Sequence, residues 1–221
     1  MGQILLVRHG QASFGAEDYD VLSEAGWAQA RRLGEWLHAQ GVVPTAVVRG
    51  DMKRHRDTAL GIAEGAGWSG FDAAVDAGWD EFDHLGLMRS VPPLPQGHTR
   101  REFQAAFEQA TAAWTAGEPG DYPETFSGFV GRVRGALERA AALAGSGETA
   151  VVVSSGGPIA VTCADLVDPD ADESGLARAW ARFNTVTVNS SVTRVLIGAT
   201  GARLLTFNEH SHLEAASLTY R

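Results

Sequence analysis

The chain has 221 residues, of which 44% are hydrophobic and 20% charged, a composition typical of a soluble globular protein with one large domain. Its formal net charge is −9 and no basic stripe is present, which argues against nucleic acid as a partner. The sequence shows no membrane-spanning apolar run and no secretory signal, and its single cysteine, Cys163, cannot form an internal disulfide. We therefore expect a cytoplasmic protein that does not associate with membranes.

The first part of the chain alternates short apolar segments with amphipathic ones. Ser23 is a good N-cap for the first helix, and Gly41 ends it. Apolar runs with β-branched residues predict strands, and apolar residues at helical spacing predict helices. On these signals we expect strands over 4–7, 46–48 and, more weakly, 74–79, with helices over 23–40 and 52–64.

The second part begins with an irregular segment over 83–98, where Pro92, Pro93 and Pro95 lie close together. Strand and helix signals follow in turn. We expect helices over 100–116, 126–144 and 158–166, a strand over 150–154, and β-rich segments over 186–197 and 203–207 joined by a glycine turn. This alternation predicts an α/β fold with a largely parallel sheet, in a single domain spanning 1–221. The block at about 83–145 is interpreted as a helical insertion over one edge of that sheet.

Polar residues gather where predicted strands end, and ligands of such sheets bind outside the carboxyl ends of the strands. Arg8, His9 and Gly10 follow the first strand, and the segment 49–54 follows the second. The stretch "VVVSSGGPIAV" at 151–161 carries small residues from a strand into a helix. Arg8 offers a planar fork suited to a phosphoryl group, and His9 can present one ring nitrogen to a pocket. Taken alone, these residues also fit a structural histidine beside a surface arginine.

Several motifs together resemble one known family. They are Arg8-His9-Gly10-Gln11, "YDVLSEAGWAQARRLGEWL", Arg54-x-x-x-Thr58-Ala59, "WDEFDH", "VVVSSGGPIA" and "LLTFNEHSHL". With these motifs, spread from residue 4 to about 213, the chain resembles the histidine phosphatase superfamily, also called phosphoglycerate-mutase-like. The resemblance implies a three-layer α/β sandwich around a mostly parallel sheet, with the helical insertion over the active-site edge.

The resemblance also implies a reaction through a covalent phosphohistidine. His9 would attack phosphorus, while Arg8 and Arg54 neutralise the phosphoryl oxygens. Glu81 would protonate the leaving oxygen and then activate water, with Asp83 as the competitor for this role. The other interpretation of Asp83 is a surface or pocket-wall carboxylate. No metal or other cofactor is expected, because two arginines and loop N–H groups supply the positive field.

Ser155 departs from the family pattern. The family usually has Ser-His-Gly-Gly where this chain has Ser154-Ser155-Gly156-Gly157, so Ser155 occupies the position of a second histidine. The Ser155 hydroxyl and the Gly156 N–H can still donate to the phosphoryl group, and both are predicted to bind it, but neither can carry a positive charge. Loss of one such donor typically costs ~3–4 kcal/mol of transition-state stabilisation.

Three other histidines are candidates to compensate, each with surface or capping roles as the alternative. These are His84, His210 and His212. The function predicted is a phosphatase that hydrolyses a small phosphomonoester of unknown identity. A phosphomutase and a non-catalytic or weakly active phosphate-binding relative remain as alternatives, and a homodimer is left open. The insertion contains few basic residues, mainly Arg89, Arg100 and Arg101. This scarcity favours hydrolysis over mutase activity.

Overall fold

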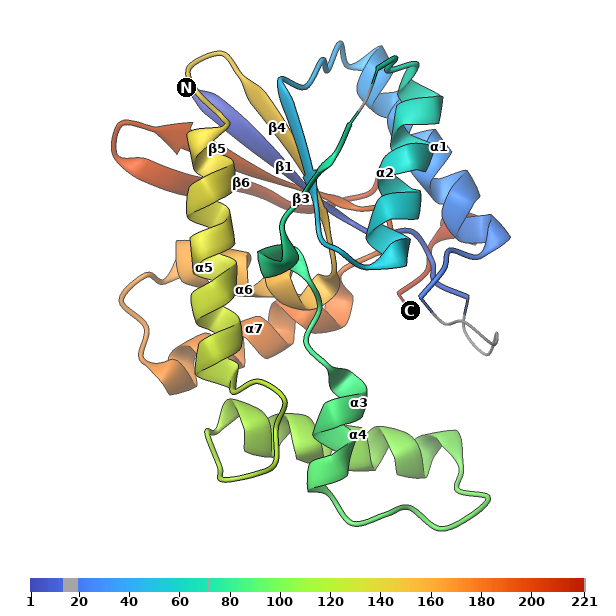
Figure 1. Cartoon of the computed structure of the whole chain (residues 1–221), viewed down its shortest axis with the longest axis vertical. Helices are drawn as coiled ribbons and strands as arrows, with labels where there is room; N and C mark the ends of the chain where they lie inside the picture. The colour runs from blue at the N-terminus through green and yellow to red at the C-terminus, as the bar shows by residue number, and fades with distance from the viewer. Residues whose placement is uncertain (14–19, 71, 221) are drawn as a thin grey trace.

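The computed structural model describes residues 1–13, 20–70 and 72–220. Within these residues a six-stranded sheet has the order β3-β2-β4-β1-β5-β6, and helices cover both of its faces (Figure 1). The strands are β1 Gly2–Arg8, β2 Ala46–Arg49, β3 Ala74–Val75, β4 Thr149–Ser154, β5 Val192–Gly198 and β6 Gly201–Glu209. The helices are α1 Glu24–Ala39, α2 Lys53–Ala66, α3 His84–Leu87, α4 Arg100–Thr115, α5 Phe126–Ala142, α6 Gly156–Val167 and α7 Glu173–Val186. Short 3-10 turns lie at Ala77–Trp79, Met88–Ser90 and Ala215–Ser217.

The sheet is parallel across β3, β2, β4 and β1. On the other side of β1, β5 pairs antiparallel with β1, and β6 pairs antiparallel with β5. In the β1–β4 pair, Arg8 is opposite Ser154, so both strands end at the same edge. The loops that follow β1 and β4 therefore begin side by side.

Alternating side chains of the central strands build a separate core on each face of the sheet. Leu5 and Val7 of β1 pack with residues of α1 and α2, while Ile4 and Leu6 pack with residues of α5, α6 and α7 on the other face. All four are completely buried, which explains why β1 reads as an unbroken apolar run. The mostly parallel α/β fold expected from the sequence is confirmed.

The segment between β3 and β4 carries α3 and α4 beyond the carboxyl edge of the sheet, while α5 returns along one face (Figure 1). An aromatic cluster fastens this segment to the core. Phe82 stacks on Trp114 with ring centroids 5.0 Å apart, and Trp114 meets Trp180 of α7 edge-on at 6.0 Å. The structure thus places helical residues over the edge where β1 and β4 end.

The helix α7 was not predicted, and the β-rich segment expected over 186–197 is wrong in its first part. Val186 is the last residue of α7, and β5 begins only at Val192. The residues between include Ser190, whose positive φ of 58° breaks an extended path. Likewise α6 begins at Gly156 rather than at Pro158, and the expected strand over 74–79 shrinks to two residues followed by a 3-10 turn.

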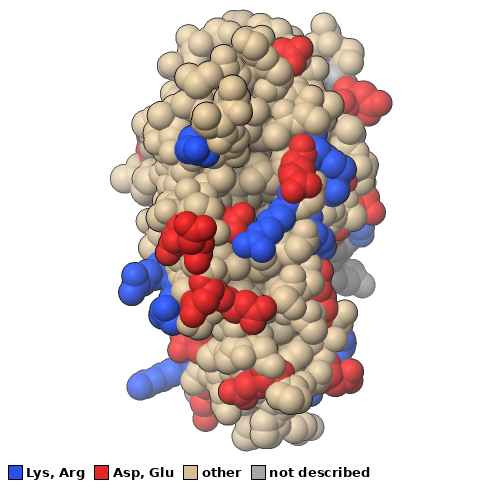
Figure 2. Space-filling model, turned by 90° about the vertical axis from the view of Figure 1, so that its left-hand side faces the viewer, with Lys and Arg blue, Asp and Glu red and all other residues tan. Residues whose placement is uncertain are grey.

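The surface carries charges of both signs. On the face shown in Figure 2, acidic and basic side chains are interspersed and no basic patch forms. Among the described residues, no helix combines the length and the apolar character needed to cross a membrane.

Candidate active site

His9 lies directly after β1, at the edge where β1 and β4 end. Its backbone N–H donates to the carbonyl of Ser154 at 2.8 Å, and its Nδ1 lies 2.7 Å from the carbonyl oxygen of Gly10. A carbonyl oxygen only accepts, so Nδ1 carries the hydrogen and Nε2 keeps its lone pair. Burial, together with the charges of Arg54 and Arg8, lowers the pKa of His9 well below 6.5. Both observations favour a neutral imidazole whose Nε2 carries the free lone pair.

Two arginines border His9 and are held from different directions. Arg8 donates through Nη1 to the carbonyl oxygen of Thr187. Its Nη2 donates to the carbonyl oxygen of Tyr220 at 3.1 Å. Arg54, in the first turn of α2, is buried and donates through Nη1 to Asp20 Oδ1 at 2.7 Å. Both guanidinium groups are thus fixed before any ligand arrives, which lowers the entropy cost of binding a phosphoryl group.

Glu81 approaches the same place from the segment before α3. Its Oε2 accepts from the N–H of Gly157 at 3.1 Å, so the carboxylate lies against the first turn of α6. A Cβ atom on Gly157 would come within 2.1 Å of Glu81 Oε1. Glycine at position 157 is therefore required for this approach.

These residues line one cavity of about 350 Å³. Its lining consists of Arg8, His9, Arg54, Glu81, Phe82, His84, Gln104, Phe107, Asn184, Thr185 and Tyr220. The structure thus brings together four of the residues that the sequence singled out for the reaction. Asn184 and Tyr220 had not been anticipated, since neither lies in a recognised motif.

Ser155 and Gly156 are placed differently from the other predicted residues, because neither lines the cavity. Ser155 is fully buried, and its Oγ lies 2.8 Å from Nε2 of His55, a completely buried histidine. Gly156 packs so tightly that a Cβ would lie 2.9 Å from Asn184 Oδ1. His55 was missed by sequence reasoning, and the only signal for it was its place directly after Arg54.

The three histidines considered as substitutes take different positions. His84 lines the cavity, and burial lowers its pKa. His210 bonds the carbonyl of Asn208 through Nδ1 at 2.6 Å, and His212 is buried beside the ring of Trp36 at 5.5 Å. Neither of these two lines the cavity. Asp83 does not line it either, and it caps α3 by accepting from the N–H of Gly86 at 2.8 Å.

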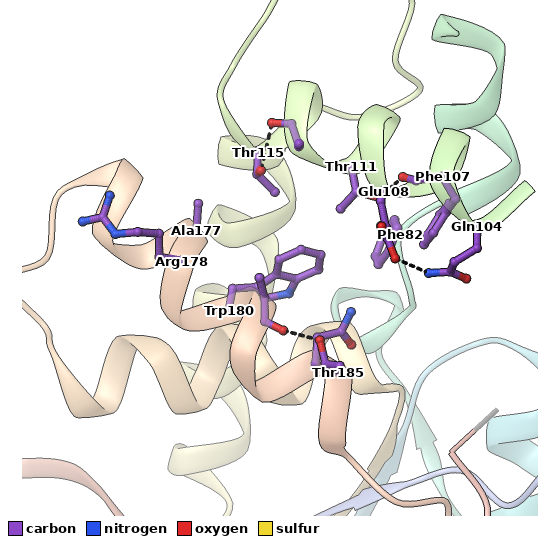
Figure 3. A pocket seen from close by; sticks show the side chains of 13 residues that line it. Phe82, Gln104, Phe107, Glu108, Thr111, Thr115, Ala177, Arg178, Trp180 and Thr185 are labelled. Atoms are coloured by element: carbon purple, nitrogen blue, oxygen red, sulfur yellow. Dashed lines mark hydrogen bonds between the residues drawn. The ribbon is translucent and has the colours of Figure 1, made fainter. Parts of the chain in front are cut away.

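A groove of about 420 Å³ opens from the cavity and runs between α4 and α7. The two spaces share Phe82, Gln104, Phe107, Asn184 and Thr185. Figure 3 shows side chains of α4 and α7 facing one another across the groove, with the rings of Phe82, Phe107 and Trp180 toward its inside. Its further lining is Glu108, Thr111, Ala112, Thr115, Ala177, Arg178 and Ala181.

Within the described ranges, no group of three or more His, Cys, Asp or Glu side chains is arranged to hold a metal ion. The positive charge bordering His9 comes instead from Arg8 and Arg54, as the charges acting on its pKa indicate.

Comparisons with known proteins agree with this architecture. The family model described as the histidine phosphatase superfamily (branch 1) matches residues 4–210. A 2,3-bisphosphoglycerate-dependent phosphoglycerate mutase of Corynebacterium diphtheriae is 42% identical over an alignment of 64 residues, which covers 26% of this chain and 26% of the mutase. The chain therefore matches only about a quarter of the length of that curated relative.

Solved structures share the fold at low sequence identity. YhfR of Bacillus stearothermophilus is 20% identical with a TM-score of 0.71, covering 96% of this chain and 99% of its own. A phosphoserine phosphatase variant of Entamoeba histolytica, in complex with phosphoserine, is 17% identical with a TM-score of 0.68. The match covers 97% of this chain and 100% of that phosphatase. A mycobacterial glucosyl-3-phosphoglycerate phosphatase is 24% identical with a TM-score of 0.66, and the match covers 95% of this chain and 100% of that phosphatase.

Proposed function

Because the chain belongs to the histidine phosphatase superfamily (branch 1), we propose that it hydrolyses phosphomonoesters through a phosphohistidine formed on His9. The observation that carries the proposal is the cavity in which a neutral His9 is bordered by Arg8, Arg54 and Glu81. Two cations and a nucleophile around one space suit a tetrahedral dianion.

In the first step, Nε2 of His9 attacks phosphorus and the ester P–O bond breaks. Glu81 gives its proton to the leaving oxygen, so the alcohol departs neutral. In the second step, Glu81 takes a proton from water, the hydroxide attacks phosphorus and the P–N bond breaks. Inorganic phosphate leaves, and both His9 and Glu81 return to their starting states.

Hydrolysis is favoured over mutase activity by the charges around the cavity. A mutase must retain an intermediate that carries a second anionic group, which requires further basic side chains. Arg8 and Arg54 are the only arginines that line the cavity within the described chain, and both are used by the transferring phosphoryl group. The arginines of the insertion, at positions 89, 100 and 101, do not line it.

The groove between α4 and α7 is proposed to hold the organic group of the substrate, because it opens directly from the phosphate cavity. Aromatic rings and the methyl groups of alanine and threonine form much of its lining. An organic group with an apolar part, aryl or alkyl, therefore fits the groove, and polar side chains such as Gln104 and Asn184 can meet polar groups on it.

The test of this function is turnover of an aryl phosphate by the purified protein, with and without a chelator. We expect activity that survives chelation, and an acid-labile phosphoenzyme that His9→Ala does not form. Turnover retained by His9→Ala would overturn the phosphohistidine mechanism. Binding of phosphate without any turnover by the unaltered protein would instead support the non-catalytic alternative.

A further inference from the structure

A row of three polar side chains lies directly behind His9, away from the cavity surface. Ser155 Oγ is 2.8 Å from His55 Nε2, and His55 Nδ1 is 3.6 Å from Asp80 Oδ1. His55 and Ser155 have no exposed surface, and the ring centroids of His55 and His9 are 5.8 Å apart. The site therefore contains a second imidazole, supplied by α2 rather than by the loop that follows β4.

The surrounding backbone is shaped to accept this imidazole. A Cβ on Gly50 would lie 2.2 Å from His55 Nδ1 and 2.5 Å from Asp80 Oδ1, so glycine leaves the space that both groups occupy. The N–H of Asp51 donates to Asp80 Oδ1 at 2.7 Å and fixes the carboxylate. His55 Nδ1 is buried and makes no hydrogen bond to a described residue, and Asp80 Oδ1 lies beside it at 3.6 Å.

Both ring nitrogens of His55 thus face groups that can accept a hydrogen, a hydroxyl on one side and a carboxylate on the other. A doubly protonated imidazole would satisfy both. Burial lowers the pKa of His55, with Arg54 acting in the same direction and Asp80 and Glu81 opposing it. A phosphoryl dianion in the cavity adds negative charge beside His9, whose ring centroid lies 5.8 Å from that of His55, and this charge favours the protonated form.

We propose that His55 supplies the charge that Ser155 cannot: its imidazole takes up a proton when a phosphoryl dianion enters the cavity and stabilises that dianion from behind His9. Ser155 and Asp80 position the ring and accept its two N–H groups. His55 touches no substrate atom and acts through the field of its charge. This inference rests on the proposed phosphatase function for its kinetic part, but the coupled uptake of a proton does not require turnover.

Calorimetric titration with sulfate tests the proton uptake, because sulfate is a tetrahedral dianion that does not itself titrate near neutrality. Titrations at pH 7 in two buffers of different ionisation enthalpy give the number of protons taken up on binding. His9 and His84, which line the cavity, are the other groups that can take up a proton there. We expect His55→Gln to remove a large part of the uptake and to weaken sulfate binding about tenfold, whereas unchanged uptake would overturn the proposal.

Kinetics on an aryl phosphate provide the second readout. We expect His55→Gln to lower kcat/KM roughly 10- to 100-fold, with the fold intact by circular dichroism. His212→Gln is the matched control, because it removes another buried imidazole that does not line the cavity, and its kcat/KM should stay unchanged. A comparable loss in both variants would show a general effect of removing a buried histidine and contradict the proposal.

Moving the imidazole separates charge from packing. The double variant His55→Ala/Ser155→His returns an imidazole to the loop after β4, and we expect it to be more active than His55→Ala alone. A double variant that folds but is no more active than His55→Ala would overturn the proposal that His55 supplies the charge missing at Ser155. If the unaltered protein has no turnover at all, the proposed function fails, and the sulfate titration still decides the role of His55.

Discussion

At the scale of single residues, the hydrogen bond between His9 Nδ1 and the Gly10 carbonyl decides which ring nitrogen can react. Without that bond, the two tautomers of a neutral imidazole would compete, and part of the protein would present a protonated Nε2 to the cavity. Burial keeps the ring uncharged, since it lowers the pKa of His9 well below 6.5. A motif of three residues thus contains both the proposed nucleophile and the acceptor that sets its tautomer.

The roles of the two carboxylates near the cavity can be separated by parallel amide substitutions. Glu81→Gln removes the proposed proton donor of the first step, so we expect kcat to fall roughly 10²- to 10⁴-fold. Asp83→Asn should leave kcat unchanged, because Asp83 caps α3 and asparagine caps a helix equally well. Steady-state kinetics on one substrate, run on both variants, check this pair. A large loss in Asp83→Asn with none in Glu81→Gln would reverse the assignment.

At the scale of secondary-structure elements, the start of α6 must lie close to Glu81. Gly157→Ala would place a Cβ within 2.1 Å of Glu81 Oε1, so the carboxylate must move. We expect a clear drop in kcat with a folded protein. Gly131→Ala in α5 is the control, because nothing lies within 4 Å of its added Cβ. That change should leave kcat unaltered and raise the unfolding free energy by up to about 1 kcal/mol, measured by urea denaturation.

The groove between α4 and α7 gives a second prediction at this scale. Ala112 lines the groove, whereas Ala105, another exposed alanine of α4, does not. Ala112→Glu places a bulky charged side chain in the groove, so we expect kcat/KM for hexyl phosphate to fall about tenfold while that for methyl phosphate stays unchanged. Ala105→Glu should change neither value. Equal effects of the two substitutions on both substrates would show that the groove does not hold the organic group.

The predictability of each element followed the range of the contacts that determine it. The ends of β1 and β4 were predicted because apolar runs and the small residues after them are local signals. The contact between His55 and Ser155 joins residues 100 positions apart, and the bond from Arg8 to Tyr220 spans 212 positions. No pattern of neighbouring residues in the sequence predicts such long-range contacts. Likewise, the β-branched residues near Val186 suggested a strand, although that residue ends a helix capped at Asp172.

At the scale of the whole molecule, buried neutral imidazoles tie stability to pH. Burial is the main cause that lowers the pKa of His212 to about 4, against 6.5 for an unperturbed histidine. The unfolded chain therefore binds a proton first as the pH falls, so stability is full above about pH 6.5 and is lost as the pH falls toward 4. His9 and His55, whose pKa values are also lowered, act in the same direction.

Urea unfolding at pH 7 and pH 5 measures this dependence. For His212 alone we expect a loss on the order of 2 kcal/mol between the two values, because each unit of pKa difference is worth about 1.4 kcal/mol. His212→Gln should lose that part of the pH dependence, although the variant is less stable at pH 7. The same decrease in both proteins would place the titration elsewhere in the chain.

The position of β1 within the sheet also has a consequence for how the chain is made. Although β1 leaves the ribosome early, both of its neighbours, β4 and β5, come from the second half of the sequence. Ile4 to Val7, an apolar segment that ends beside His9, therefore has no strand to pair with until more than half of the chain has been synthesised. Such late pairing of β1 slows folding and leaves an apolar, aggregation-prone segment exposed on the nascent chain. The strand that ends beside His9 thus stays unpaired until β4 and β5 have both been synthesised.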